Sequence, residues 1–379
     1  MKDEGFSKVM DQNMTMMMDM PKMDHTTSTD KHFVQMMIRF LLLFFLTTSF
    51  ATTEAAEIRG QQPNVGIDTK GIIRMVYGEG EKIYCITSTN NGNNFSNPVL
   101  VGEINEMHLG HTRGPQIASS KNYTLISAID KAGTVHSYRL NHQSGKWAKS
   151  GNVNDTKGSA VEGLMALTAD TEDNFYAVWL DIRAGKKNNI FFSTVNGKSS
   201  SWAKNLMVYK SPEGNVCECC KPNISANNGR VVIGFRNWLM GSRDIYYAVS
   251  TNKGKTFSAP EKSGTGTWRL NACPMDGGGL AINESGITST AWRRNSEVYF
   301  WSENQPEQKL GTGRDVSMAQ SKSNTVVSWQ DKNKIKVMDL KKDKITEVGN
   351  GISPRVYTLA NGKVICVWED DKVVRYKLI

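Results

Sequence analysis

The chain has 379 residues, 39% of them hydrophobic, and 46 Lys and Arg against 37 Asp and Glu leave a formal net charge of +9. This length suits one large domain, and the basic balance favours anionic partners. No block of basic residues and no RNA-type aromatic motif accompanies that charge, so we expect no nucleic-acid partner.

Residues 1–35 form a methionine-rich extension. Soft ligands gather in it as Met14, Met16, Met17, Met18, Met20, Met23 and His25. Thioether and imidazole groups suit Cu(I). The interpretation that we favour is a disordered or untranslated extension, because a signal sequence ordinarily starts a chain and Met36 or Met37 offers such a start.

Residues 36–56 have the layout of a signal peptide. Arg39 precedes an apolar run over residues 40–46, and Ser49-Phe50-Ala51 offers a cleavage site. The run is short for a bilayer span, so an uncleaved anchor is the second interpretation. We expect a periplasmic or secreted protein, free of the membrane after cleavage, whose folded domain covers residues 57–379.

The mature chain repeats a unit of four short strands. Units begin near residues 62, 113, 162, 221, 274, 314 and 354, a spacing typical of propeller blades. We therefore predict an all-β fold, a β-propeller of seven four-stranded blades, with six as the alternative. The last unit has only three strands, and "AEIRG" near residue 57 is expected to supply its outer strand and close the ring.

Aromatic residues recur at the end of the second strands, as Tyr77, Trp179, Trp292, Trp329 and Trp368. Large aromatic side chains bury the most area, so we expect them to pack between blades.

One peptide occurs twice in almost the same form. "STNNGNNFSNP" starts at Ser88 and "STNKGKTFSAP" at Ser250. Each is predicted to turn between a third and a fourth strand, with Ser and Asn bonding the turn backbone, Gly at positive φ and Phe packed inward. The peptide resembles the Asp-box of sialidase-like (BNR-repeat) propellers, with Asn where Asp is commoner, and in that family these turns are structural.

The stretches "VWLDIR", "CECCKP", "GFRN" and "NACP" resemble an exported bacterial subgroup usually labelled exo-α-sialidase. The resemblance implies three arginines that grip a substrate carboxylate, a Tyr nucleophile assisted by Glu, and an Asp acid/base. Candidates for these catalytic roles are Arg113, Arg314, Arg355, Tyr357 and Asp181. The early Arg-Ile-Pro signature is missing and no Glu partner for the Tyr is evident, so strict sialidase activity is doubtful.

Other charged residues stand before innermost strands or after second strands, which open on one face of a propeller. We expect a charged axial funnel with the substrate-binding residues Glu162, Glu218, Lys221, Arg236, Asp276 and Asp315. The expected partner is sialic acid or another acidic glycan, without a cofactor. The alternative for each arginine is a surface or blade-bridging ion pair.

All six cysteines lie in the mature chain. Cys219, Cys220 and Cys273 precede innermost strands of adjacent blades, so we predict a disulfide between residues 217–220 and Cys273. The alternatives are a soft-metal site made of these three residues with Cys217, or a reactive thiol. Cys85 and Cys366 are expected to be buried on strands.

Three functions remain open at this point. The first is an exported propeller that binds or processes glycans, the second an active exo-α-sialidase with retained anomeric configuration, and the third a metal-linked or scaffolding propeller that uses the cysteine cluster.

Overall fold

The computed structural model describes residues 57–322 and 324–379. The predicted methionine-rich extension and signal peptide lie outside these residues. The described part consists of strands, turns and loops, and it contains no helix that could cross a membrane.

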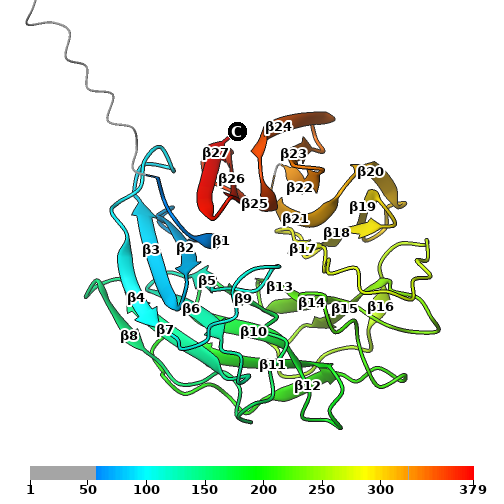
Figure 1. Ribbon diagram of the computed structural model, residues 1–379, viewed down its shortest axis with the longest axis horizontal. Coiled ribbons are helices and arrows are strands. Elements are labelled where there is room, and N and C mark those ends of the chain that lie inside the picture. The colour runs from blue at the N-terminus through cyan, green and yellow to red at the C-terminus, as the bar shows by residue number, and fades with distance from the viewer. Residues whose placement is uncertain (1–56, 323) are drawn as a thin grey trace, which may run out of the picture. The chain divides into compact units, whose positions relative to one another are not determined.

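The strands form seven antiparallel sheets, each a meander in sequence order, arranged as the blades of a ring (Figure 1). Blade 1 contains β1 (Gln61–Ile67), β2 (Ile73–Glu79), β3 (Lys82–Ser88) and β4 (Val99–Glu103). Blade 2 contains β5 (Gln116–Ser119), β6 (Tyr123–Ile129), β7 (Val135–Asn141) and β8 (Lys146–Lys149). Blade 3 contains β9 (Met165–Ala169), β10 (Asn174–Asp181), β11 (Asn189–Asn196) and β12 (Leu206–Tyr209).

Blade 4 contains β13 (Asn223–Asn227), β14 (Arg230–Arg236), β15 (Ile245–Ser250) and β16 (Glu261–Lys262). Blade 5 contains β17 (Gly279–Ile282), β18 (Thr288–Arg294), β19 (Glu297–Ser302) and β20 (Gln308–Thr312). Blade 6 contains β21 (Arg314–Gln320), β22 (Thr325–Asp331), β23 (Lys334–Asp339) and β24 (Lys344–Asn350). Blade 7 contains β25 (Ile352–Thr358), β26 (Val364–Asp370) and β27 (Val373–Leu378). The prediction of seven blades is confirmed.

Residues 58–60 supply the outer strand of blade 7. The Val374 N–H donates to the Ile58 carbonyl at 2.8 Å, and the Gly60 N–H donates to the Lys372 carbonyl at 2.8 Å. The chain then enters β1, so one segment ties the last blade to the first, which lie side by side (Figure 1). The predicted closure is therefore present, and it removes the free edge that blade 7 would otherwise expose.

The core lies between neighbouring blades. Trp329 is 1% exposed and packs with Val316 and Met338 of its own blade and with Ala291 and Leu310 of blade 5. The other four aromatic residues of the second strands are also buried. Their predicted packing role is confirmed.

The repeated peptide forms the predicted turn. The Ser88 hydroxyl accepts the Gly92 N–H at 2.9 Å, and Asn90 Oδ1 accepts the Asn94 N–H at 3.2 Å. Gly92 has φ of 83°, and Phe95 packs edge-on against Tyr376 of blade 7. The second copy, starting at Ser250, repeats these bonds. Each copy thus secures its own turn and packs against the preceding blade.

Three innermost strands begin with a bulge. The register shifts in β1, β21 and β25, where Gln62, Asp315 and Ser353 have φ of 54°, 55° and 55°. β17 differs from the prediction, because it begins at Gly279 instead of near Pro274. The preceding residues form a loop that carries Cys273 and Asp276.

Candidate functional site

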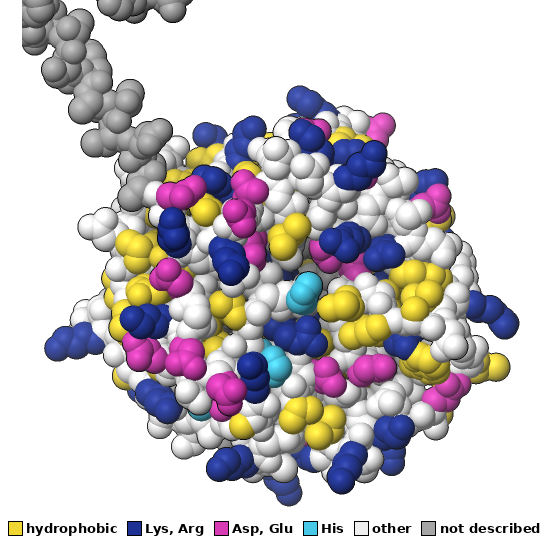
Figure 2. Space-filling view, viewed as in Figure 1, with side chains coloured by type: hydrophobic (Ala, Val, Ile, Leu, Met, Phe, Trp, Pro, Cys, Tyr) yellow, Lys and Arg dark blue, Asp and Glu magenta, His cyan; other side chains and the backbone are white. Residues whose placement is uncertain are grey.

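Three connected cavities follow the axis of the ring. An outer pocket of about 360 Å³ lies among the entry loops of blades 1, 2, 5, 6 and 7. An axial channel of about 350 Å³ is lined by the innermost strands of all seven blades. Between them lies a small cavity, the neck, which shares Asp315 and Ser353 with the outer pocket and Lys221 and Arg355 with the channel. Figure 2 shows Lys, Arg and His side chains gathered near the centre of one face.

Two basic side chains among the described residues line the neck without a direct hydrogen-bond or ion-pair partner, Lys221 and Arg355. Lys221 is 8% exposed, and within the described residues neither its amine nor the Arg355 guanidinium has a hydrogen-bond or ion-pair partner. Burial and the nearby Arg355 lower the pKa of Lys221 well below its usual range. Unpaired buried cations are costly, and that cost falls when an anion enters.

Two carboxyl groups, those of Asp276 and Asp315, line the same neck. Asp276 is 1% exposed and accepts the N–H groups of Asp315 at 2.9 Å and Gly278 at 3.1 Å. Burial, followed by the charge of Asp276, raises the pKa of Asp315 to about 6. Asp315 is therefore a carboxyl group that can donate a proton near neutral pH, whereas Asp276 supports the backbone that carries it.

The three candidate arginines have different surroundings. Arg314 is 57% exposed and lines the outer pocket with its Nε 3.7 Å from Asp315 Oδ2. Arg355 lines the neck and the channel. Arg113 turns to Glu162 of the next blade, donating to its carbonyl at 2.6 Å and approaching its carboxylate at 3.7 Å. The structure thus brings two arginines to the cavities, and Arg113 makes a blade-bridging ion pair.

Asp181 and Tyr357 have different surroundings, because Tyr357 lines the channel and Asp181 lines none of the three cavities. Asp181 is fully buried and accepts from Ser159 at 2.7 Å and from Trp179 Nε1 at 2.8 Å, besides an ion pair with Arg183. Tyr357 lines the channel, and its hydroxyl donates to Asn64 at 3.4 Å. Burial raises the pKa of Tyr357, and among the described residues no carboxylate bonds its hydroxyl. A nucleophilic Tyr needs such a partner.

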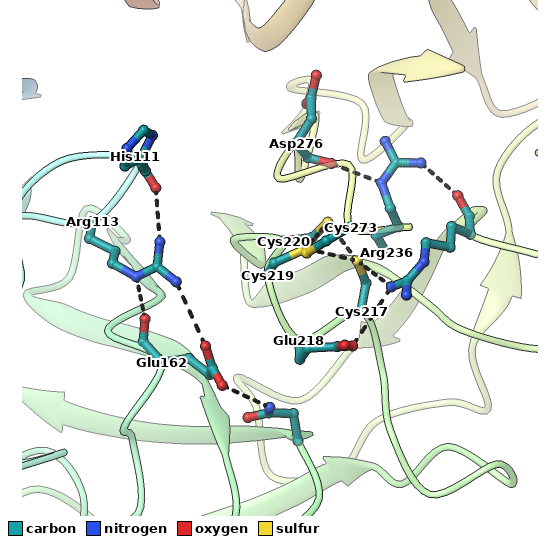
Figure 3. The surroundings of a disulfide bond; sticks show 12 residues. His111, Arg113, Glu162, Cys217, Glu218, Cys219, Cys220, Arg236, Cys273 and Asp276 are labelled. Atoms are coloured by element: carbon teal, nitrogen blue, oxygen red, sulfur yellow. Dashed lines mark hydrogen bonds and ion pairs between the residues drawn. A yellow bond between two sulfur atoms is a disulfide. The ribbon is translucent and has the colours of Figure 1, made fainter. Parts of the chain in front are cut away.

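Glu218 and Arg236 lie beside the cysteines (Figure 3). Arg236 is buried and donates to the carbonyls of Asp276 at 2.8 Å, Arg243 at 2.6 Å and Arg293 at 3.0 Å. Glu218 lies 3.7 Å from Arg243. Both predicted binding residues therefore help to hold the entry loops of blades 4 and 5.

Cys219 and Cys273 stand at disulfide distance, with their Cα atoms 6.3 Å apart. Their loops meet at the border of blades 4 and 5 (Figure 3), as predicted. Cys217 and Cys220 are free thiols whose Sγ atoms are 2.7 Å apart. Cys85 and Cys366 are buried on β3 and β26.

Sequence reasoning missed the polar wall of the outer pocket. Glu369 is buried and accepts from the Gln62 backbone N–H at 3.2 Å and from the Gln62 amide at 3.3 Å, and Ser353 lies beside them. A signal existed, because each bulge residue follows a glycine by two positions in "GQQ", "GRD" and "GIS". Comparing these tripeptides would have placed Gln62, Asp315 and Ser353 in equivalent positions.

No family model matches the chain, and no curated protein matches it either. Among solved structures, a polysaccharide lyase of family PL25, an ulvan lyase bound to -[GlcA(1-4)Rha3S]-, is 9% identical with a TM-score of 0.51, over 86% of this chain and 94% of that one. A Hadza microbial sialidase is 9% identical with a TM-score of 0.49, over 84% of this chain and 65% of that one. Virginiamycin B lyase from Staphylococcus aureus is 9% identical with a TM-score of 0.49, over 85% of this chain and 98% of that one.

At these identities the comparisons concern the fold alone, and the likeness rests on the ulvan lyase. The expected fold is shared with the ulvan lyase. Membership of the exported subgroup with the Cys-x-Cys-Cys loop stays a prediction.

Proposed function

We propose that the protein binds an acidic glycan at the axis and that Arg355 holds the glycan's carboxylate at the neck. The observation that carries this proposal is the pair of basic side chains at the neck, the buried Lys221 and the half-buried Arg355, which have no hydrogen-bond or ion-pair partner within the described residues. A planar guanidinium binds a carboxylate through two parallel hydrogen bonds. An anionic sugar therefore supplies the direct partner that Lys221 and Arg355 lack within the described residues.

The outer pocket suits the remainder of such a ligand. Its volume of about 360 Å³ falls in the range of roughly 300–1,000 Å³ usual for small-ligand sites. Arg314 adds an exposed cation at its rim, and the hydrogen-bonded Gln62 and Glu369 offer fixed polar atoms to sugar hydroxyl groups. Export of the protein, which would bring it to extracellular glycans, stays a prediction.

Calorimetry tests the proposal with two acidic sugars and one neutral sugar. Sialyllactose and a glucuronate disaccharide should bind, whereas lactose should not. Arg355→Ala should weaken binding at least about 30-fold, since truncating one side of a charge pair costs about 2 kcal/mol or more. Lys255→Ala is the control, because it removes one positive charge from the exposed turn between β15 and β16, at the opposite end of its blade.

Equal binding of acidic and neutral sugars would overturn the proposal. So would an Arg355→Ala variant that keeps its thermal transition and binds like the wild type.

A second candidate function, glycoside hydrolysis, is favoured by Asp315, whose pKa of about 6 suits a general acid. The hydrogen-bonded Tyr–Glu pairs of the described residues, Tyr247–Glu261 and Tyr299–Glu297, do not line the axial cavities. Tyr357, which does, bonds Asn64 instead of a carboxylate. A fluorogenic sialoside should therefore be turned over weakly or not at all. If release clearly exceeds that in buffer and Arg314→Ala abolishes it, the hydrolase function replaces simple binding.

A further inference from the structure

We propose that Cys217, Cys219, Cys220 and Cys273 form a tetrathiolate site for a soft cation, Zn(II) or Cu(I), when the Cys219–Cys273 disulfide is reduced. This site is separate from the axial cavities and does not depend on glycan binding. The oxidised protein carries a disulfide in the same place, so oxidation and metal binding exclude each other.

The sulfur positions fit one small ion. The Sγ atoms of Cys217, Cys219 and Cys220 all lie within 4.8 Å of one another. Cys219 Sγ is 3.7 Å from Cys217 Sγ and 3.9 Å from Cys220 Sγ. Sulfurs placed tetrahedrally about 2.3 Å from a zinc ion are roughly 3.8 Å apart. Two of the three distances therefore already match a tetrahedral site, and Cys273, bonded to Cys219, brings the fourth sulfur.

The backbone holds the donors in place before any ion arrives. The Cys217 N–H donates to the Arg236 carbonyl at 3.0 Å, and the Cys220 N–H donates to the Cys217 carbonyl at 3.3 Å. These bonds fold residues 217–220 into a tight turn ahead of β13, while Cys273 comes from the loop ahead of β17 (Figure 3). The site would thus join blades 4 and 5 as the disulfide does.

The surrounding charges favour an anionic complex. Arg243 donates to Cys217 Sγ at 3.1 Å. Arg236 is 1% exposed and bonds only backbone carbonyls, so within the described residues its charge has no carboxylate partner. Glu218 approaches Arg243 at 3.7 Å from a half-exposed position. A divalent ion with four thiolates carries a net charge of −2, which two guanidinium groups can balance.

The chemistry balances with a dithiol as reductant. The dithiol gives up two electrons and closes its own disulfide, while the Cys219–Cys273 bond opens to two thiols. The four thiols then release their protons to solvent as the ion binds. Cys217, Cys219 and Cys220 are buried, and the exposed Cys273 completes the set from the loop ahead of β17. Four thiolates fill a tetrahedral coordination sphere, so the site matches a structural metal site, with no open coordination position for catalysis.

Full-length protein, reduced with a dithiol and freed of it under nitrogen, is titrated with Cd(II) as the probe. We expect one Cd(II) per chain with a sulfur-to-cadmium absorption band, and no band for the oxidised protein. The band reports thiolate ligands, so methionines elsewhere do not produce it. Competition by Zn(II) and by Cu(I) then identifies which of the two cations the site prefers.

Cys217→Ser and Cys273→Ser should each weaken Cd(II) binding at least about tenfold, whereas Cys366→Ala, a buried cysteine on β26, should not. The comparison of oxidised with reduced wild type stays decisive if a variant fails to fold. The proposal is wrong if reduced wild type shows no band, if oxidised protein binds equally, or if folded Cys217→Ser and Cys273→Ser bind like wild type.

Discussion

Asp315→Asn should make the protein more stable at neutral pH. The Asp315 side chain is 17% exposed and lies beside Asp276. Its partial burial, followed by the charge of Asp276, raises its pKa to about 6 from an ordinary value of 3.8. Asparagine has the same shape, carries no charge, and tolerates the φ of 55° that this residue adopts. The substitution therefore removes the ionisation and keeps the bulge of β21.

The number of protons bound by the folded and unfolded states determines how the free energy of unfolding changes with pH. The unfolded chain loses this proton near pH 3.8, whereas the folded protein keeps it until about pH 6. Between these values the folded state binds more protons, so the free energy of unfolding falls as the pH rises through this window and stays lowered above it. A shift of about 2 pKa units at about 1.4 kcal/mol each corresponds to at most about 3 kcal/mol.

Urea denaturation of wild type and Asp315→Asn between pH 4 and pH 8 measures this effect. The variant should be more stable by about 2–3 kcal/mol at pH 7, and the difference should shrink towards pH 4. Asp371→Asn is the matched control, because Asp371 also has positive φ, 49°, but is exposed. A difference between wild type and Asp315→Asn that does not change with pH, or a less stable variant at pH 7, would refute the assignment of a costly buried charge.

Three further predictions concern the fold, and thermal or urea denaturation tests each. Gly254→Ala should destabilise the protein more than Gly71→Ala. Both glycines have positive φ, but only at Gly254 would the added methyl group meet a ring, that of Phe192. Equal losses of stability would contradict this. Trp329→Ala should cost about 3–5 kcal/mol by leaving a cavity between blades, and a loss under 1 kcal/mol would contradict the packing. A chain shortened to start at Gln61 should melt at a lower temperature, because blade 7 loses its outer strand; an unchanged transition would show that closure is dispensable.

The propeller was predictable because its signals are local. The turn at Ser88 is made by side chains that bond backbone groups within four residues, so its chemistry is written in one short peptide. Aromatic residues recur at the end of the second strands, and this repeated position predicted that they are buried between blades. The meeting of Cys219 with Cys273 also followed, because both precede the innermost strands of adjacent repeats.

The charged site was only partly predictable. Arg113 precedes β5, Arg314 begins β21 and Arg355 lies within β25, all three of them innermost strands. Arg113 bonds Glu162, Arg314 is exposed, and Arg355 has no partner within the described residues. The repeat determines the position of a residue in its blade. The partner of its side chain and its burial depend on residues of other blades.

Contacts with distant residues also distinguish Asp181 from Asp315, although sequence patterns placed both in the expected site. Asp181 is buried against Trp179 and Ser159, whereas Asp315 is turned towards the neck by a bulge and lies next to Asp276. The sequence by itself determined the repeat, the turns and the ring. Only the tertiary structure decided which charges are paired, because pairing and pKa depend on contacts between residues far apart along the chain.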